Sequence, residues 1–173
     1  MKPVIRRILL LTFSVLVLAG CSAQERDALR VGEESISEQG LTDLVLALSG
    51  GAPDGEEPSA LSAQTFREIG AVWLRDAAAL TYLEENGVTI TPSERDGIKS
   101  EIENAIVAQQ LGAISRQSEG YEALTTNLWV ASQGSALAAP DVQEELLTLV
   151  KNGAVSSRIG KFDVETFELV PRG

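Results

Sequence analysis

The sequence predicts one mainly α-helical domain, residues 28–173, with about five helices and a short β-strand pair formed by the two ends of the mature chain. Three observations support this fold class. Apolar residues recur three and four positions apart through most of the chain, as on the buried face of a helix. Capping residues stand before several of these segments, and strand-like segments are confined to the two ends. A chain of 173 residues has room for one such domain.

Residues 1–20 have the pattern of a signal peptide. Lys2, Arg6 and Arg7 give a positively charged start, and an apolar run over residues 8–18 follows. As a helix, this run and the two residues after it would reach about 20 Å at roughly 1.5 Å per residue, which is too short for a hydrocarbon core of about 30 Å. A short apolar region closed by small residues is typical of a secretory signal rather than of a transmembrane helix.

The end of this segment resembles the bacterial lipobox. Leu18, Ala19 and Gly20 precede Cys21, the only cysteine of the chain. The resemblance implies cleavage before Cys21 and attachment of a diacylglyceryl group to its thiol, with residues 21–27 as the lipidated cysteine and tether. We therefore expect a lipid-anchored protein on the extracytoplasmic face of a cell membrane, held to the bilayer through acylated Cys21. The alternative is an ordinary signal peptide followed by a free thiol.

The domain is expected to begin with a strand and a capped helix. Residues 28–31 have strand character, and residues 32–35 have the composition of a turn. Ser37 is the predicted N-cap of the first helix. Ile36 and Leu41 stand at the two positions of a hydrophobic staple across that cap.

The second helix is predicted to be the longest. The first helix ends at two glycines, and residues 50–59 are expected to form an exposed loop rich in Gly, Pro and acidic residues. The second helix then covers residues 63–86. Its predicted buried face consists of Phe66, Ile69, Trp73, Ala77, Leu80 and Leu83. We interpret Trp73 on this face as a core residue rather than a ligand platform.

Three further helices follow. Thr91, Pro92 and Glu94 form a capping box with proline in the first turn, and the third helix continues to about Gly112. The fourth helix covers residues 121–133. Its buried candidates are Leu124, Leu128 and Trp129. The fifth begins at Pro140 and ends near Asn152, and its buried candidates are Val142, Leu146 and Leu149.

The C-terminal segment is expected to return as strands. Residues 154–162 and 167–170 have the composition of two short strands around a turn. We expect part of this segment to pair with residues 29–31, which would bring the two ends of the domain together.

The chemistry that the sequence supports is limited. The chain has no histidine, which excludes Ser–His and Cys–His nucleophiles and His-ligated zinc. It carries 14 basic and 25 acidic side chains, a net charge of −11, and this charge disfavours binding to nucleic acid. Pairs of adjacent acids occur at 33–34, 56–57, 84–85 and 144–145. We interpret them as solvated surface, and we predict no enzymatic activity, no cofactor and no metal site.

Three segments together resemble SurA-like periplasmic chaperones. Residues 31–41 are similar to the strand–turn–helix opening of their N-terminal domain, with Gly40 where the pattern has an acid. Residues 83–94 are similar to the link between two of their helices. Residues 155–163 are similar to the ending of actinobacterial lipoproteins that carry this domain, although Ser157 and Ile159 stand where Pro and Tyr are commoner.

The SurA-like resemblance implies a helical cradle that binds unfolded or extended segments of other secreted proteins, with its first strand paired to a returning C-terminal strand. Many relatives add a parvulin prolyl-isomerase domain. This chain lacks the histidines of the parvulin signature, so the resemblance does not carry isomerase activity over. Two hypotheses remain open: a membrane-anchored lipoprotein with chaperone-like client binding, or a structural or partner-docking lipoprotein that keeps the fold without binding clients. The residues that would bind clients are not predicted.

Overall fold

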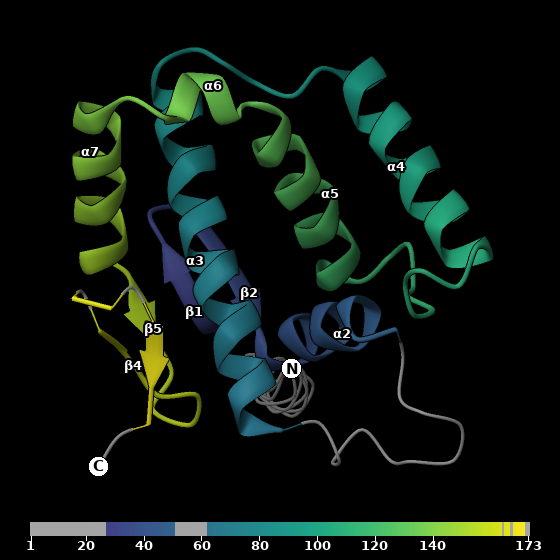
Figure 1. The fold of residues 1–173 in the computed structure, drawn as a ribbon, viewed down its shortest axis with the longest axis horizontal. Coiled ribbons are helices and arrows are strands. Elements are labelled where there is room, and N and C mark those ends of the chain that lie inside the picture. Colours follow the sequence, from purple (N-terminus) through teal and green to yellow (C-terminus); the bar gives the residue numbers. More distant parts are fainter. Residues whose placement is uncertain (1–26, 51–61, 164, 167, 172–173) are drawn as a thin grey trace, which may run out of the picture.

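The computed structural model describes residues 27–50, 62–163, 165–166 and 168–171 (Figure 1). The predicted signal peptide, the lipobox, Cys21, the loop over residues 51–59, the acidic pair within it and Phe167 lie outside them. The described helices are α2 (Glu38–Leu48), α3 (Ala63–Glu85), α4 (Pro92–Val107), α5 (Glu119–Ser132), α6 (Gly134–Leu137) and α7 (Pro140–Lys151). The described strands are β1 (Asp27–Val31), β2 (Glu34–Ser37), β3 (Ala154–Val155), β4 (Lys161–Asp163) and β5 (Glu168–Val170). The fold is thus mainly helical with small antiparallel sheets, as predicted.

The N-terminal segment forms a hairpin and not a single strand followed by a turn. β1 and β2 pair antiparallel. Of the four residues predicted to form the turn, 32–35, only Gly32 and Glu33 do so, and the other two belong to β2. Gly32 has a φ of +58°, which a residue with a side chain rarely adopts. Ile36 of β2 lies in the core, where it is 1% exposed.

The closure of the two ends is confirmed. β1 lies at the centre of a three-stranded sheet in the order β2-β1-β3, and Leu29 pairs with Val155 of β3. The Ser156 N–H donates to the Ala28 carbonyl oxygen at 2.8 Å, which extends the pairing by one residue. Residues about 125 positions apart in the sequence therefore hold each other in register.

The helix starts follow the capping chemistry of the sequence. The Gly40 N–H donates to Ser37 Oγ at 3.0 Å at the start of α2, as expected of an N-cap. At the start of α4, the Thr91 N–H donates to the Glu94 carboxylate at 2.8 Å, and the Glu94 N–H donates back to Thr91 Oγ1. The predicted capping box is present.

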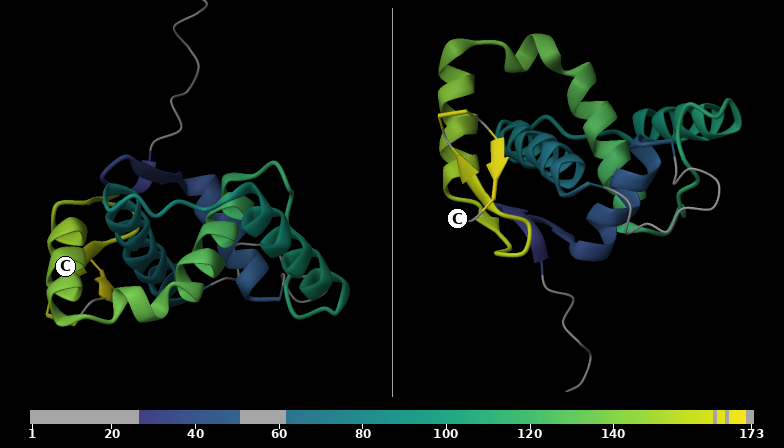
Figure 2. Two further views of the ribbon diagram at one scale, coloured as in Figure 1. Left: turned by 90° about the horizontal axis from the view of Figure 1, so that it is seen from above. Right: turned by 60° about the horizontal axis from the view of Figure 1, so that its bottom comes forward.

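α3 is the central helix (Figure 1). It contacts the hairpin, α2, α5, α7 and β5, and its middle is buried on most sides. Four of the six residues predicted for its buried face are in the core, namely Trp73, Ala77, Leu80 and Leu83, while Phe66 and Ile69 are partly buried. α4 and α7 lie at opposite ends of the molecule, with α3 and α5 between them (Figure 2).

α4 ends earlier than the predicted limit near Gly112. Its last residue is Val107, and Gln109 adopts a left-handed conformation with a φ of 56°. The Gln110 N–H donates to the Ala105 carbonyl and the Gln109 N–H to the Ile106 carbonyl, which is the bonding pattern of a Schellman motif. The reversal brings the Gly112 N–H to the Ala47 carbonyl at 2.8 Å, so the chain after α4 is tied to the end of α2.

The remaining helices differ from the predictions at two points. Leu124 and Trp129 of α5 are buried, but Leu128 is 38% exposed because it lies on the outer side of the helix. The four-residue helix α6 was not predicted, and it contributes the buried Leu137. On α7, Val142 is buried, while Leu146 and Leu149 pack against the core from a partly exposed position.

The C-terminal strands do not all join one sheet. β3 pairs with β1, whereas β4 and β5 form a separate two-stranded sheet in which Phe162 lies opposite Leu169. Leu169 is 4% exposed and packs close to Gly70 of α3. This second sheet covers the lower part of α3 in Figure 1.

Candidate binding surface

The residues predicted for the anchor lie outside the described structure. Leu18, Ala19, Gly20 and Cys21 precede β1, which begins at Asp27. Asp27 lies six positions after Cys21. An extended chain spans at most about 3.3–3.6 Å per residue, so the start of the domain lies within about 20 Å of the predicted lipid attachment point. Among the described residues, no helix has both the length and the apolar character needed to cross a bilayer.

The acidic pairs of the described chain do not gather into a metal centre. Within the residues that the structure describes, no three Asp, Glu or Cys side chains are placed to hold an ion. Two pairs nevertheless approach one another, because the hairpin turn lies near the end of α3. Burial, and then the negative charge of Glu84, raise the pKa of Glu34.

The two tryptophans are core residues, as predicted from their helical positions. Trp73 is 5% exposed and Trp129 is 2% exposed. The Trp129 indole N–H is buried and has no hydrogen-bond partner of good geometry among the described residues. The indole also lowers the pKa of the Glu94 carboxyl, but the hydrogen bonds from Thr91 are the larger cause.

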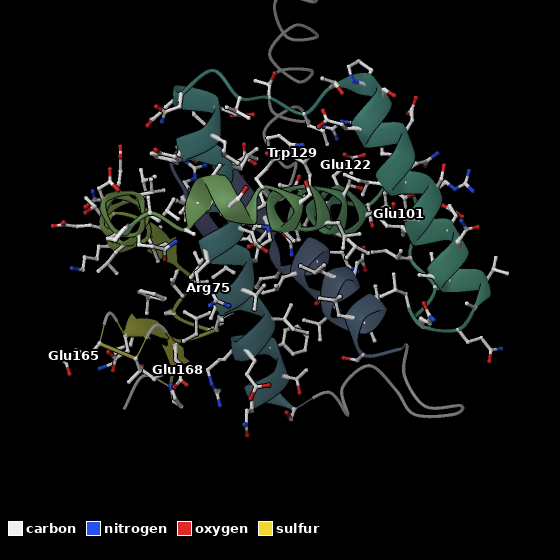
Figure 3. All side chains as sticks on the ribbon, turned by 45° about the horizontal axis from the view of Figure 1, so that its top comes forward. Arg75, Glu101, Glu122, Trp129, Glu165 and Glu168 are labelled. Atoms are coloured by element: carbon white, nitrogen blue, oxygen red, sulfur yellow. The ribbon has the colours of Figure 1, made fainter. Side chains whose placement is uncertain are left out.

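An apolar cavity lies between α3, α5, α6 and α7. Its volume is about 230 Å³. The apolar residues that line it are Ala79, Val130, Leu137, Leu146 and Val150, and Gln143 adds one amide. Arg75 and Asp76 of α3 are its charged lining residues, and Figure 3 shows Arg75 projecting from α3 on the side of α7 and the C-terminal strands. The cavity is therefore an apolar space with one carboxylate in its wall.

Asp76 is the most perturbed group of this cavity. Burial raises its pKa to about 6, and the positive charge of Arg75 opposes part of the shift. Its carboxylate forms no hydrogen bond or salt bridge with any described residue. Burial removes hydration from this carboxylate and the charge of Arg75 offsets only part of the loss, so a cation that enters the cavity would interact favourably with it.

Asp76 was not singled out in the sequence, although a signal was present. It stands three residues after Trp73 and four residues before Leu80, which places an acid on the predicted apolar face of α3. An acidic residue on the buried face of a helix usually forms an ion pair or belongs to a binding or catalytic site. The cavity itself depends on the unpredicted helix α6 and could not be inferred.

A second concavity lies beside β2, between the hairpin, α3 and α5. Its volume is about 260 Å³, and its floor is formed by Ile36, Trp73, Ala77 and Ala123. Its walls carry three carboxylates, those of Glu34, Glu119 and Glu122. We call it the acidic groove.

Two of these carboxylates are already engaged. The Ser37 N–H donates to Glu119 Oε2 at 2.8 Å, which ties the end of β2 to the start of α5. Glu122 forms salt bridges with Arg95 at 2.6 Å and with Lys99 at 2.7 Å, and Figure 3 shows it on the side of α5 toward α4. No lining residue of the groove is basic, so Glu34 faces it without a cation from the wall.

The Asp76 cavity and the acidic groove each offer a ligand apolar contact and charge together. Both concavities combine an apolar floor or wall with at least one carboxylate, an arrangement that can hold an apolar or basic side chain. The similarity to SurA-like domains remains a prediction from sequence patterns. Comparison of the chain with protein-family models, with characterised proteins and with solved structures found no match.

Proposed function

We propose that the protein is a membrane-anchored extracytoplasmic lipoprotein with chaperone-like binding of unfolded or extended segments of secreted proteins, without catalysis. The observation that supports binding is the apolar cavity between α3, α5, α6 and α7 with the unpartnered carboxylate of Asp76 in its wall. The lipobox ending at Cys21 supports the anchor, and the short tether keeps the domain close to the bilayer.

The size of the cavity favours a side chain as its occupant. Pockets for cofactors and drug-sized ligands usually have volumes of about 300–1,000 Å³. A cavity of about 230 Å³ is smaller than these and suits one or two side chains of a longer chain. A client segment that inserts an apolar side chain, and then continues over the surface, fits this geometry.

The charge of the cavity favours a basic client. Asp76 offers a negative charge that Arg75 compensates only in part, and the whole chain carries a net charge of −11. A lysine or arginine side chain can bury its aliphatic stem against Leu137 and Leu146 and place its charged end at Asp76. We therefore expect segments in which a basic residue stands beside apolar residues to bind best, at micromolar affinity or weaker because the client must be ordered.

The test is suppression of aggregation without ATP. Residues 22–173 contain every described helix and strand, so this soluble form is suitable. It is mixed at near-stoichiometric ratio with one basic and one acidic unfolded client, at low and at high salt, and light scattering is followed. We expect a delay that is longer for the basic client and a gap that salt narrows. If neither client is delayed, chaperone-like binding is wrong and the docking hypothesis takes its place.

Matched variants locate the binding at the cavity. Ala79 is buried in the cavity wall, so Ala79→Leu fills part of it, whereas Ala131→Leu makes the same change at an exposed position of α5. We expect the first variant to weaken the delay and the second to leave it intact. Asp76→Asn should reduce the preference for the basic client while keeping a delay for both. An unchanged delay in Ala79→Leu would show that clients bind elsewhere.

A further inference from the structure

β2 is an edge strand that borders the acidic groove. The three-stranded sheet has the order β2-β1-β3, so β2 has a neighbour on one side only. Its other edge faces the groove, because Glu34, Ser35 and Ile36 all line it. An edge strand exposes unpaired backbone N–H and C=O groups, which are a template for another extended segment.

The direction of the Ser35 backbone groups follows from the bonds of its neighbours. In a strand, the N–H groups of residues two positions apart point to the same side. The Ser37 N–H points away from β1, since it donates to Glu119 at 2.8 Å. Ser35 therefore also directs its N–H and C=O away from β1 and toward the groove.

The opposite strand agrees with this assignment. Ser35 lies across from Arg30. Arg30 directs its carbonyl oxygen toward β3, because that oxygen lies within 2.6 Å of the position that a Cβ at Gly153 would take. The pair Arg30 and Ser35 thus makes no backbone hydrogen bonds with each other, and the outer pair of groups on Ser35 remains available at the edge.

We propose that the acidic groove binds a short extended segment rich in basic residues, which adds as a strand to the free edge of β2 through the N–H and C=O of Ser35. An apolar side chain of this segment would lie on the floor formed by Trp73 and Ala123, and a lysine or arginine would lie beside Glu34. This site is separate from the Asp76 cavity and would function whether or not that cavity binds clients.

The groove limits the occupant in charge and in length. Glu122 is paired with Arg95 and Lys99, but Glu34 and Glu119 have no cation beside them in the groove lining, so an acidic segment is repelled and a basic one is attracted. Burial, and then the charge of Glu84, raise the pKa of Glu34, and the lining of the groove places no basic residue beside it. The edge is blocked at one end by Glu119 and at the other by the turn at Gly32, so contact extends over about three or four residues of the segment.

The test replaces the edge-facing N–H without changing the rest of the strand. Ser35→Pro removes this donor, and because the group points away from β1 the hairpin keeps its own bonds. Ser35→Ala keeps the backbone donor and is the matched control. The probe is a blocked nine-residue peptide in which lysine alternates with valine, with a peptide of alternating glutamate and valine as its counterpart. Binding to residues 22–173 is followed by tryptophan fluorescence and by the amide NMR signal of Ser35.

We expect the lysine peptide to bind the unsubstituted chain and Ser35→Ala alike. Its affinity for Ser35→Pro should fall by about tenfold, since the backbone hydrogen bond that the Ser35 N–H donates to the peptide is lost. A lysine peptide N-methylated at alternate positions, tested on the unsubstituted chain, should bind about tenfold more weakly, and this result holds even if Ser35→Pro fails to fold. Equal binding of the methylated and unmethylated peptides, or of the glutamate and lysine peptides, would overturn the proposal.

The same measurements separate this site from the proposed client cavity. Ala79→Leu should leave binding of the lysine peptide at Ser35 unchanged, and Ser35→Pro should leave the aggregation delay unchanged. Suppose that Ala79→Leu loses peptide binding and that the peptide does not shift the Ser35 amide signal of the unsubstituted chain. The peptide would then bind in the Asp76 cavity, and this result would overturn strand addition at β2 but not the proposed client binding.

Discussion

Gly120 of α5 lies directly against Gly40 of α2. A methyl group on Gly120 would stand 2.7 Å from the Gly40 carbonyl oxygen and 2.8 Å from the Leu44 amide nitrogen. The two helices therefore cross with their backbones in contact, and a side chain on either glycine would force them apart. The crossing also accounts for a departure from the SurA-like pattern: an acid at position 40 would meet the carboxylate of Glu119, which a Cβ there would approach to 2.6 Å.

We expect Gly120→Ala to destabilise the domain by about 2–3 kcal/mol, because the methyl group meets two backbone atoms and the Asp43 Cβ, none of which can rotate away. The measurement is the free energy of unfolding from a urea titration. Gly97→Ala is the control. Gly97 lies within α4 with nothing within 4 Å of its Cβ position, so alanine there should stabilise the helix by about 0.5–1 kcal/mol. Equal effects of the two variants would contradict the close crossing.

Asp76 should make the stability of the domain depend on pH. Burial raises its pKa to about 6 from a usual value of 3.8, so the folded state holds a proton that the unfolded state releases. The free energy of unfolding should therefore fall as pH rises from about 4 to 6, and the full penalty should be present at pH 7. Allowing for its partial exposure, we expect Asp76→Asn to stabilise the domain by about 1–2 kcal/mol at pH 7 and by little at pH 4.

The control for this prediction is Asp96→Asn, which removes one negative charge from an exposed position of α4. At pH 7 both variants make the net charge one unit less negative, so any effect of overall charge is common to both there. The prediction concerns the difference between their stability profiles over pH 4 to 7.5. Parallel profiles would show that Asp76 is not destabilised by burial.

Local signals could be predicted from the sequence, and contacts between distant elements could not. Ser37 and Thr91 cap their helices with groups that lie within three residues, so their roles were visible in the sequence. The end of α4 was missed, because Gln109 and not a glycine takes the left-handed position. The helix ends early because of a tertiary contact: the chain turns there, and the Gly112 N–H then donates to the Ala47 carbonyl of α2.

The candidate binding surface shows the same limit. The sequence predicted a cradle only through the SurA-like resemblance and named none of its residues. The Asp76 cavity is lined in part by Leu137 of the short helix α6, which was not predicted. The acidic groove is lined by residues of β2, which the sequence predicted largely as a turn. Both depend on helix and strand assignments of a few residues, which have weak periodicity.

Removal of the returning strands should unfold much of the domain. Deleting residues 155–173 removes Val155 from its pairing with Leu29 and exposes the surface of α3 that Leu169 covers. We expect a clear fall in melting temperature. The point variant Leu169→Ala should cost about 2–4 kcal/mol, because Leu169 is 4% exposed. Val107→Ala is the control, since Val107 is 83% exposed and its truncation should be nearly neutral. An unaltered melting temperature after the deletion would show that the second sheet contributes nothing to the fold.

The last prediction concerns Cys21, on which the membrane location depends. In a bacterial host, we expect the mature protein to carry lipid on Cys21 and Cys21→Ala to accumulate as an unprocessed precursor of higher mass, since the lipobox cysteine is both the modified residue and the cleavage position. A single myristoyl-length chain binds membranes only with a constant of about 10⁴ M⁻¹, so stable attachment requires the two or three chains of a lipoprotein. Mass spectrometry of the detergent-extracted protein reports the modification, and fractionation reports the attachment. Ser22→Ala is the control, because it alters the neighbouring residue and leaves the cysteine in place. The anchor would be disproved by an unmodified Cys21 thiol on a protein that is recovered in the soluble fraction.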